Sequence, residues 1–113
     1  MRFEARDLKP YAEPVTADEL QPGSVYFSVQ FIDEHLLIPC VEPLVFLGRD
    51  LSVSETGLYF QDPGSYQDGI RFDGANASEG TFYVQPDDQV NHIFSYERAL
   101  DVLMSCSLRR REA

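Results

Sequence analysis

Basic side chains are scarce in this chain, and their scarcity excludes several classes of function. The sequence contains a single lysine, Lys9, and between Tyr11 and Glu97 it places fifteen carboxylates against two basic side chains, Arg49 and Arg71. Direct nucleic-acid binding requires clustered basic residues. Nucleotide sites use glycine-rich phosphate loops, and neither of the common loop motifs occurs in this sequence. We therefore expect no direct nucleic-acid binding and no nucleotide cofactor.

Cysteine and long apolar runs are also scarce. The two cysteines, Cys40 and Cys106, are too few for a disulfide scaffold, and neither belongs to a Cys-x-x-Cys pair. Both are predicted to be buried thiols. No stretch approaches the roughly twenty apolar residues of a membrane-spanning helix, and the N-terminus lacks the apolar run of a signal peptide. These absences predict a protein without a membrane segment, located in the cytoplasm.

What the chain does contain is enough apolar and aromatic material for one folded domain. It has 113 residues, 43% of them hydrophobic, with eight Phe and six Tyr. Such a composition can offset the entropy that a chain loses on folding. Residues 1–14 mix charges without periodicity and contain Pro10 and Pro14. We therefore predict an extended N-terminal arm over residues 1–14 and a single globular domain over residues 15–113.

Short β-strands dominate the predicted secondary structure. In residues 25–31 apolar side chains recur at every second position, which predicts a strand with one buried face. The segment 38–43 contains two prolines, so it can form an edge strand or a connection but not a central strand. The motif at 62–65 suits a type II turn. Further strands are predicted at 44–47, 58–60, 70–72 and 81–84.

Helical signals flank these strands. Thr16 and Glu19 fit a capping box, which predicts a short helical turn. From Ser95 onward apolar residues recur at helical spacing, and the three arginines at 109–111 suit the C-terminal end of a helix. The predicted fold class is α+β, mostly antiparallel β: a small curled sheet or partly closed barrel of about five short strands, with one C-terminal α-helix and a short N-terminal helical turn.

Catalytic and metal sites have little support in the sequence. Cys40 and His35 would point to opposite faces of an extended segment, and Cys106 could meet His92 only through a tertiary contact. Asp33 and His35 would share one face of a strand, but two ligands do not make a metal site. We therefore predict no catalytic residues, no metal and no cofactor.

The alternation of side chains predicts one recognition surface. It places Tyr26, Tyr59, Tyr83 and Arg71 on the outward side of their strands. Tyr and Arg are the residue types that contribute most of the binding energy at protein interfaces. The structural alternative is that outward tyrosines stabilise a sheet by cross-strand pairing or lie under the terminal helix.

These observations favour a non-enzymatic acidic binding protein, of adaptor or inhibitor type, that recognises a basic protein partner through this tyrosine patch. A field of one sign attracts basic surfaces before any contact is made, and it can also imitate a phosphate backbone. The alternative is a small-ligand- or metal-binding barrel protein, an enzyme included, with a site near Asp33, His35 and His92. A third hypothesis is a homo-oligomer that buries the tyrosine face in itself.

Overall fold

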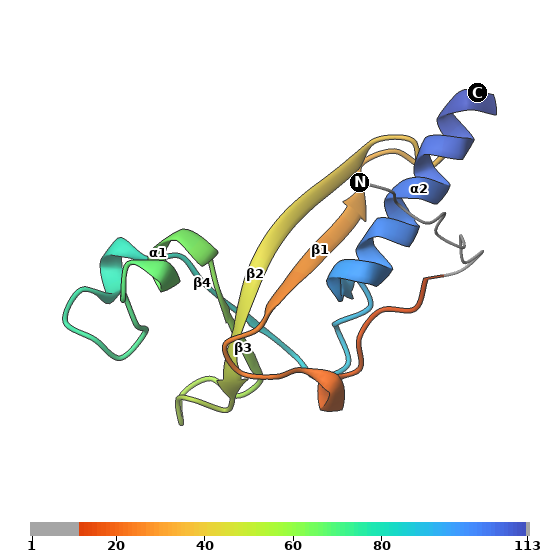
Figure 1. Cartoon of the computed structure of the whole chain (residues 1–113). Helices are drawn as coiled ribbons and strands as arrows, with labels where there is room; N and C mark the ends of the chain where they lie inside the picture. Colours follow the sequence, from red (N-terminus) through yellow and green to blue (C-terminus); the bar gives the residue numbers. More distant parts are fainter. Residues whose placement is uncertain (1–11, 113) are drawn as a thin grey trace, which may run out of the picture.

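Five antiparallel strands form an open sheet in the order β4-β3-β2-β1-β5 (Figure 1). In this computed structural model, which describes residues 12–112, the strands are β1 (Val25–Phe31), β2 (Pro39–Arg49), β3 (Leu58–Gln61), β4 (Phe82–Gln85) and β5 (Ile93–Phe94). The helices are α1 (Pro63–Gln67) and α2 (Tyr96–Glu112), and two 3-10 turns are η1 (Ala17–Glu19) and η2 (Ala77–Glu79). The predicted α+β class, the C-terminal helix and the short N-terminal turn are confirmed.

The sheet is neither curled nor closed, so the predicted barrel is wrong. Within residues 12–112, β4 pairs only with β3 and β5 pairs only with β1, which makes these two strands the edges of the sheet. Closure would require β4 to pair with β5. However, β5 is only two residues long, because the chain turns into α2 directly after Phe94. Periodicity predicts which residues form strands but not which strands pair.

The strand β2 runs through the two prolines that the sequence analysis excluded from a central strand. From Pro39 to Leu44 it pairs with β1 alone, and its pairing with β3 begins at Val45. Pro39 and Pro43 therefore lie in the half of β2 that has one neighbour in the described structure. A missing N–H group is tolerated at such a position because no second strand needs the donor. The edge position predicted for this segment is right for that half of the strand.

The segment after β3 forms helix α1 where a type II turn was predicted, and residues 70–72 form no strand. The Asp62 carboxylate caps α1 by accepting a hydrogen bond from the backbone N–H of Ser65 at 2.9 Å. Gln61 is fully buried, and its Nε2 donates to Ser65 Oγ at 2.9 Å and to the Ile70 carbonyl at 2.7 Å. A side-chain bond thus ties Ile70 to the sheet, in place of the ladder bonds of a strand, and both predictions are wrong.

Each face of the sheet buries its own hydrophobic cluster. The face that carries Tyr26 and Ser28, which we call the groove face, is covered near η1 by the buried residues Val15 and Leu20. The opposite face, which we call the helix face, packs Val29 and its neighbours against α2. Figure 1 shows α2 lying alongside β1. Because both faces of β1 are covered, the prediction of one inward face for this strand describes only half of its packing.

Side-chain contacts fix helix α2 near both of its ends. Helix α2 begins at Tyr96, where the Ser95 hydroxyl accepts from the Arg98 N–H at 3.4 Å, and near its end Arg109 donates to the Leu36 carbonyl from Nε at 3.1 Å and from Nη2 at 2.9 Å. The predicted arm lies outside the described residues except for 12–14. Among residues 12–112, no helix is long and apolar enough to cross a membrane.

Candidate binding groove

A groove of about 460 Å³ lies on the groove face of the sheet, between the strands and the loop that joins β4 to β5. Pairing of strands brings its walls together, since Ser28 lies opposite Glu42 and Phe60 lies opposite Tyr83. This volume falls in the range of pockets that bind small ligands or anchor side chains, about 300–1,000 Å³. The lining residues are Ser28, Gln30, Glu42, Leu44, Phe60, Tyr83, Gln85, Gln89, Asn91 and His92.

Most polar side chains of the groove are not used to hold the fold together. The side chains of Gln30, Glu42, Tyr83, Gln85 and Gln89 make no hydrogen bond or ion pair with any residue in the described part of the chain. Four of these residues are exposed and Gln85 is half-buried, so their polar atoms are open to solvent. A row of partnerless amides and hydroxyls along one depression is therefore available to a ligand.

The electrostatic character of the groove is set by one carboxylate. Among residues 12–112, Glu42 is the only acidic residue that lines it, and no Lys or Arg does so. Burial lowers the pKa of His92 from its ordinary value, since desolvation disfavours the imidazolium. His92 is therefore a neutral imidazole at neutral pH, with Nδ1 at 3.5 Å from the Asn91 Oδ1. The groove thus carries a net negative charge and many oxygen acceptors.

The predicted tyrosine patch does not form as a single exposed surface. Tyr26 is 7% exposed and its hydroxyl accepts from the Gln21 N–H at 2.8 Å, while Tyr59 is 4% exposed and donates its hydroxyl proton to the Glu55 carbonyl. The outward orientation predicted for these two tyrosines is wrong. The strand register also places Tyr59 on the helix face, whereas Tyr26 lies on the groove face.

Two members of the predicted patch are exposed, but they lie apart. Tyr83 is 36% exposed and lines the groove. Arg71 is exposed beside α1, where its guanidinium carbon lies 4.1 Å from the centroid of the Tyr66 ring and its Nη1 donates to the Tyr66 carbonyl at 3.0 Å. Only Tyr83 therefore belongs to the groove.

The residues of the alternative site are distributed over two places. Asp33 closes the turn between β1 and β2, since its Oδ1 accepts from the N–H groups of Leu37 at 3.0 Å and Ile38 at 2.8 Å. Desolvation raises the pKa of Asp33, but these amide bonds outweigh it, and the pKa lies below its ordinary value. His35 is a largely exposed residue of the same turn, whereas His92 lines the groove. No group of three or more His, Cys, Asp or Glu in residues 12–112 could hold a metal ion.

The two thiols differ in their surroundings. Cys106 is buried on α2, with Sγ at 3.6 Å from the Leu37 carbonyl oxygen, as predicted. Cys40, which lies opposite Gln30 in the β1–β2 pair, is exposed, and the prediction of a buried thiol is wrong there. Cys106 packs under the helix face and His92 lies on the groove face, so the structure does not bring them together.

Sequence reasoning missed the amides and the glutamate of the groove. Gln30, Gln85, Gln89 and Asn91 carry no titratable group and belong to no catalytic motif, so a search for chemistry passes over them. A signal was nevertheless present in β1, where Ser28 and Gln30 alternate with the apolar residues. That alternation indicates a polar face, and a polar sheet face next to a loop rich in amides can form a recognition groove.

Comparison of the chain with protein-family models, with curated proteins and with solved structures gave no match.

Proposed function

We propose that this protein is a non-enzymatic binding protein, of adaptor or inhibitor type, that recognises a basic protein partner. The observation that carries the proposal is the groove itself. It presents one carboxylate, from Glu42, together with side-chain oxygens that have no partner among the described residues, and no lysine or arginine among those residues lines it. A pocket of this composition complements a cation and repels few of the groups found on a basic protein surface. The cytoplasmic location expected from the sequence is part of the same proposal.

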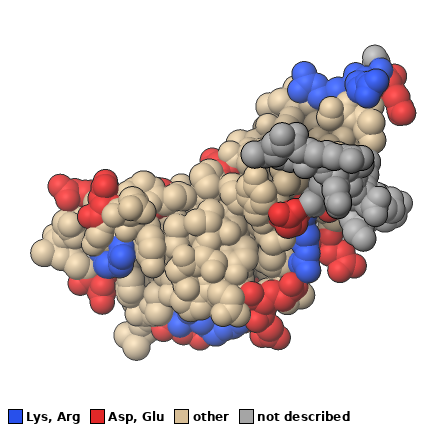
Figure 2. Space-filling model, in the orientation of Figure 1, with Lys and Arg blue, Asp and Glu red and all other residues tan. Residues whose placement is uncertain are grey.

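The charge of the surrounding body supports a basic partner. The two basic residues of the acidic stretch are already engaged, Arg49 with Asp87 and Arg71 with Tyr66. Several carboxylates have no ion pair or hydrogen bond within residues 12–112, namely Glu55, Asp68, Asp73, Glu79 and Asp88. Figure 2 shows acidic side chains around the α1 end of the molecule. This uncompensated charge accelerates encounter with a basic surface at low salt.

The contact surface of the proposal is the groove with Tyr83, in place of the four-residue tyrosine patch. Tyr83 is an exposed aromatic side chain whose hydroxyl has no partner in the described structure. Tyrosine is a common anchor at interfaces because it buries a large area at a low entropic cost. Tyr26 and Tyr59 contribute indirectly, because their rings support the sheet from within.

Affinity capture with matched baits tests this function. The wild-type protein, a Tyr83→Ala variant and an Asp68→Asn variant are used as baits in a lysate of the source cell at low and moderate salt. We expect one stoichiometric basic protein that is retained at moderate salt by the wild type and by Asp68→Asn and is lost with Tyr83→Ala. Calorimetry with that purified protein then gives the stoichiometry. Absence of any stoichiometric partner at both salts contradicts the proposal.

A second candidate is a small-ligand protein that uses the same groove. The observation that favours it is His92, a neutral imidazole beside the partnerless amides. A neutral imidazole can donate and accept hydrogen bonds, and it can also accept a proton from a bound ligand. A rise in melting temperature on adding one member of a metabolite library, abolished in His92→Ala, supports this candidate. A library that leaves the melting temperature unchanged counts against it.

A further inference from the structure

We infer that the groove receives an arginine side chain of the basic partner; this inference rests on the function proposed above. An arginine carries its charge on a planar guanidinium with five N–H donors and no acceptor. The groove offers the complementary set, in which oxygen acceptors surround one carboxylate. The identity of the anchor residue follows from three features of the groove: its acceptors, its apolar surfaces and its charge.

The acceptors come from both sides of the groove. Glu42 projects from β2 beside Ser28 of β1, and Gln85 of β4 and Gln89 of the following loop line the same depression. A carboxylate can accept two parallel N–H bonds from one guanidinium, and such charge-assisted bonds are about twice as strong as neutral ones. The amide oxygens then satisfy the donors that Glu42 does not reach. A lysine ammonium presents three donors from one point and lacks the planar fork that matches a carboxylate.

The aromatic surface of the groove suits the methylene stem and the planar guanidinium of an arginine. Leu44 and Phe60 form the floor of the groove but are themselves buried, at 7% and 0% exposure. The aromatic surface that a ligand can reach is the exposed ring of Tyr83, which lies opposite Phe60 in the β3–β4 pair. A guanidinium stacks on an aromatic face, which contributes through cation–π attraction. The methylene stem of an arginine covers apolar surface while its charged head reaches polar groups. The groove thus has a place for each part of the side chain.

The test uses N-acetyl-L-arginine amide as the probe in an NMR titration of the isotope-labelled full chain at low salt. N-acetyl-L-citrulline amide has nearly the same shape without the charge, and N-acetyl-L-lysine amide has the charge without the planar fork. We expect saturable shifts of the side-chain amide signals of Gln30, Gln85 and Gln89 with the arginine probe. Citrulline is expected to bind at least about tenfold more weakly, and lysine several-fold more weakly.

Two variants test whether the arginine probe binds beside Glu42 in the groove. Glu42→Gln keeps the shape of the side chain and removes its charge, and we expect about tenfold weaker binding of the arginine probe, with a well-dispersed spectrum as proof of folding. Asp68→Asn removes one charge from the α1 end of the molecule and is expected to change the affinity by less than about twofold. Equal binding of arginine and citrulline, or an unchanged affinity in Glu42→Gln, overturns the inference.

The outcomes separate this inference from the proposed function. If the captured basic protein binds and requires Tyr83, but the arginine probe produces no saturable shift in the groove, then the function stands and the arginine anchor is wrong. If no basic protein is captured and the probe does not bind, both are wrong. If the probe binds but no protein is captured, the groove is a site for a guanidinium ligand and the proposed protein partner is wrong.

Discussion

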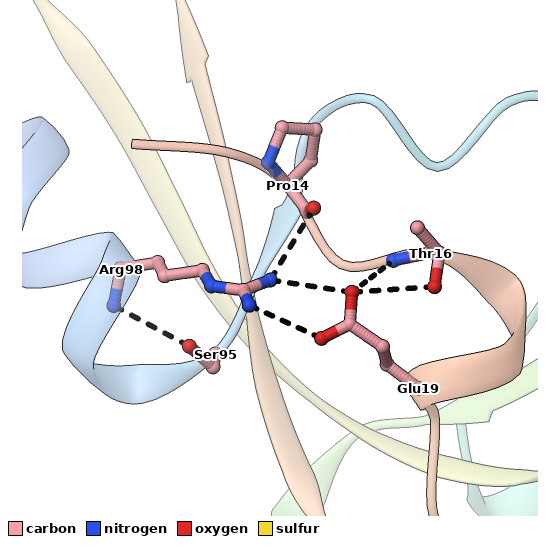
Figure 3. Close-up of polar contacts among 5 residues, drawn as sticks. All are labelled: Pro14, Thr16, Glu19, Ser95 and Arg98. Atoms are coloured by element: carbon pink, nitrogen blue, oxygen red, sulfur yellow. Dashed lines mark hydrogen bonds and ion pairs between the residues drawn. The ribbon is translucent and has the colours of Figure 1, made fainter. Parts of the chain in front are cut away.

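Arg98 of α2 forms an ion pair with Glu19 of η1, with Nη2 at 3.1 Å from Oε2 (Figure 3). The Glu19 carboxylate also accepts the Thr16 N–H at 3.0 Å, and the Arg98 Nη1 lies 3.5 Å from the Pro14 carbonyl. One guanidinium therefore joins the last helix to the segment that enters the domain. That segment includes Val15, which is buried in the cluster under the groove face, so the pair fixes one border of the sheet surface that carries the groove.

The first prediction concerns this ion pair. Arg98→Ala is expected to lower the melting temperature by a few degrees at low salt and by less at high salt, because the pair is partly exposed and salt screens it. Arg98→Lys keeps the charge but loses the fork geometry, so it should fall between the wild type and Arg98→Ala. Thermal unfolding of the three proteins at two salt concentrations gives the answer. Equal melting temperatures for all three at low salt would show that the pair contributes nothing.

The second prediction concerns stability in acid. The pKa of Asp62 is lowered, first by the hydrogen bond from the Ser65 hydroxyl and then by the N–H groups of Ser65 and Thr81. Because the folded-state pKa lies below that of the unfolded chain, the unfolded state binds the proton first. The Asp62 carboxylate therefore stabilises the folded state. This contribution to the free energy of unfolding is present above the ordinary aspartate pKa of 3.8 and is lost as the pH falls through the lowered folded-state pKa.

Asp62→Asn tests the acid contribution because asparagine caps a helix about as well as aspartate. The variant should be less stable than the wild type at neutral pH, and the difference should shrink as the pH falls below about 4. Denaturant unfolding at a series of pH values measures it, with Asp68→Asn as the control for loss of one exposed carboxylate. A stability difference that does not depend on pH is the result that contradicts this assignment.

The third prediction uses two glycines with different surroundings. Gly57 has φ of +138°, and a Cβ there would lie 2.6 Å from the Gln85 carbonyl oxygen; Gly69 has φ of +83° with nothing within 4 Å. Gly57→Ala is expected to cost about 2–4 kcal/mol, from backbone strain plus the clash. Gly69→Ala is expected to cost about 1–2 kcal/mol, from strain alone. Denaturant unfolding compares them, and equal losses would rule out the clash with β4.

The fourth prediction links the groove to His92. A bound guanidinium disfavours a second positive charge nearby, so the arginine probe should lower the pKa of His92 further. By linkage, the probe should bind more weakly at a pH below the pKa of His92, as located by the same titration, than at about pH 8, where the imidazole is neutral. Asn91 contacts the ring through its Oδ1, and Glu42 is the titratable carboxylate among the described residues that line the same groove. NMR titration of the His92 ring signals measures the change, and a pKa that the probe leaves unchanged places the probe elsewhere.

Local signals in the sequence predicted local structure well. The capping box at Thr16 and Glu19, the alternation in β1 and the helical period after Ser95 each correspond to an element of the fold. These patterns act within a few residues, so periodicity and capping chemistry are sufficient to reveal them. The proline at position 63 was ambiguous, because the same Asp-Pro start suits a turn and the first turn of a helix.

Tertiary features could not be read from the same patterns. Tyr26 and Tyr59 are buried because different parts of the chain cover the two faces of the sheet, and alternation assigns side chains to faces without saying which face is covered. The groove likewise depends on pairing between β1 and β2 and between β3 and β4, which brings Glu42 and Gln85 into one depression. Such long-range pairing is not encoded in local periodicity.

The central claim is that the partner contacts the groove face of the sheet, and a cross-saturation NMR experiment with the captured basic protein tests it most directly. The account predicts attenuation at Gln30, Tyr83 and Gln85, lost in Glu42→Gln at moderate salt. Attenuation confined to the helix face, where Val25 and Tyr96 are exposed, would contradict it.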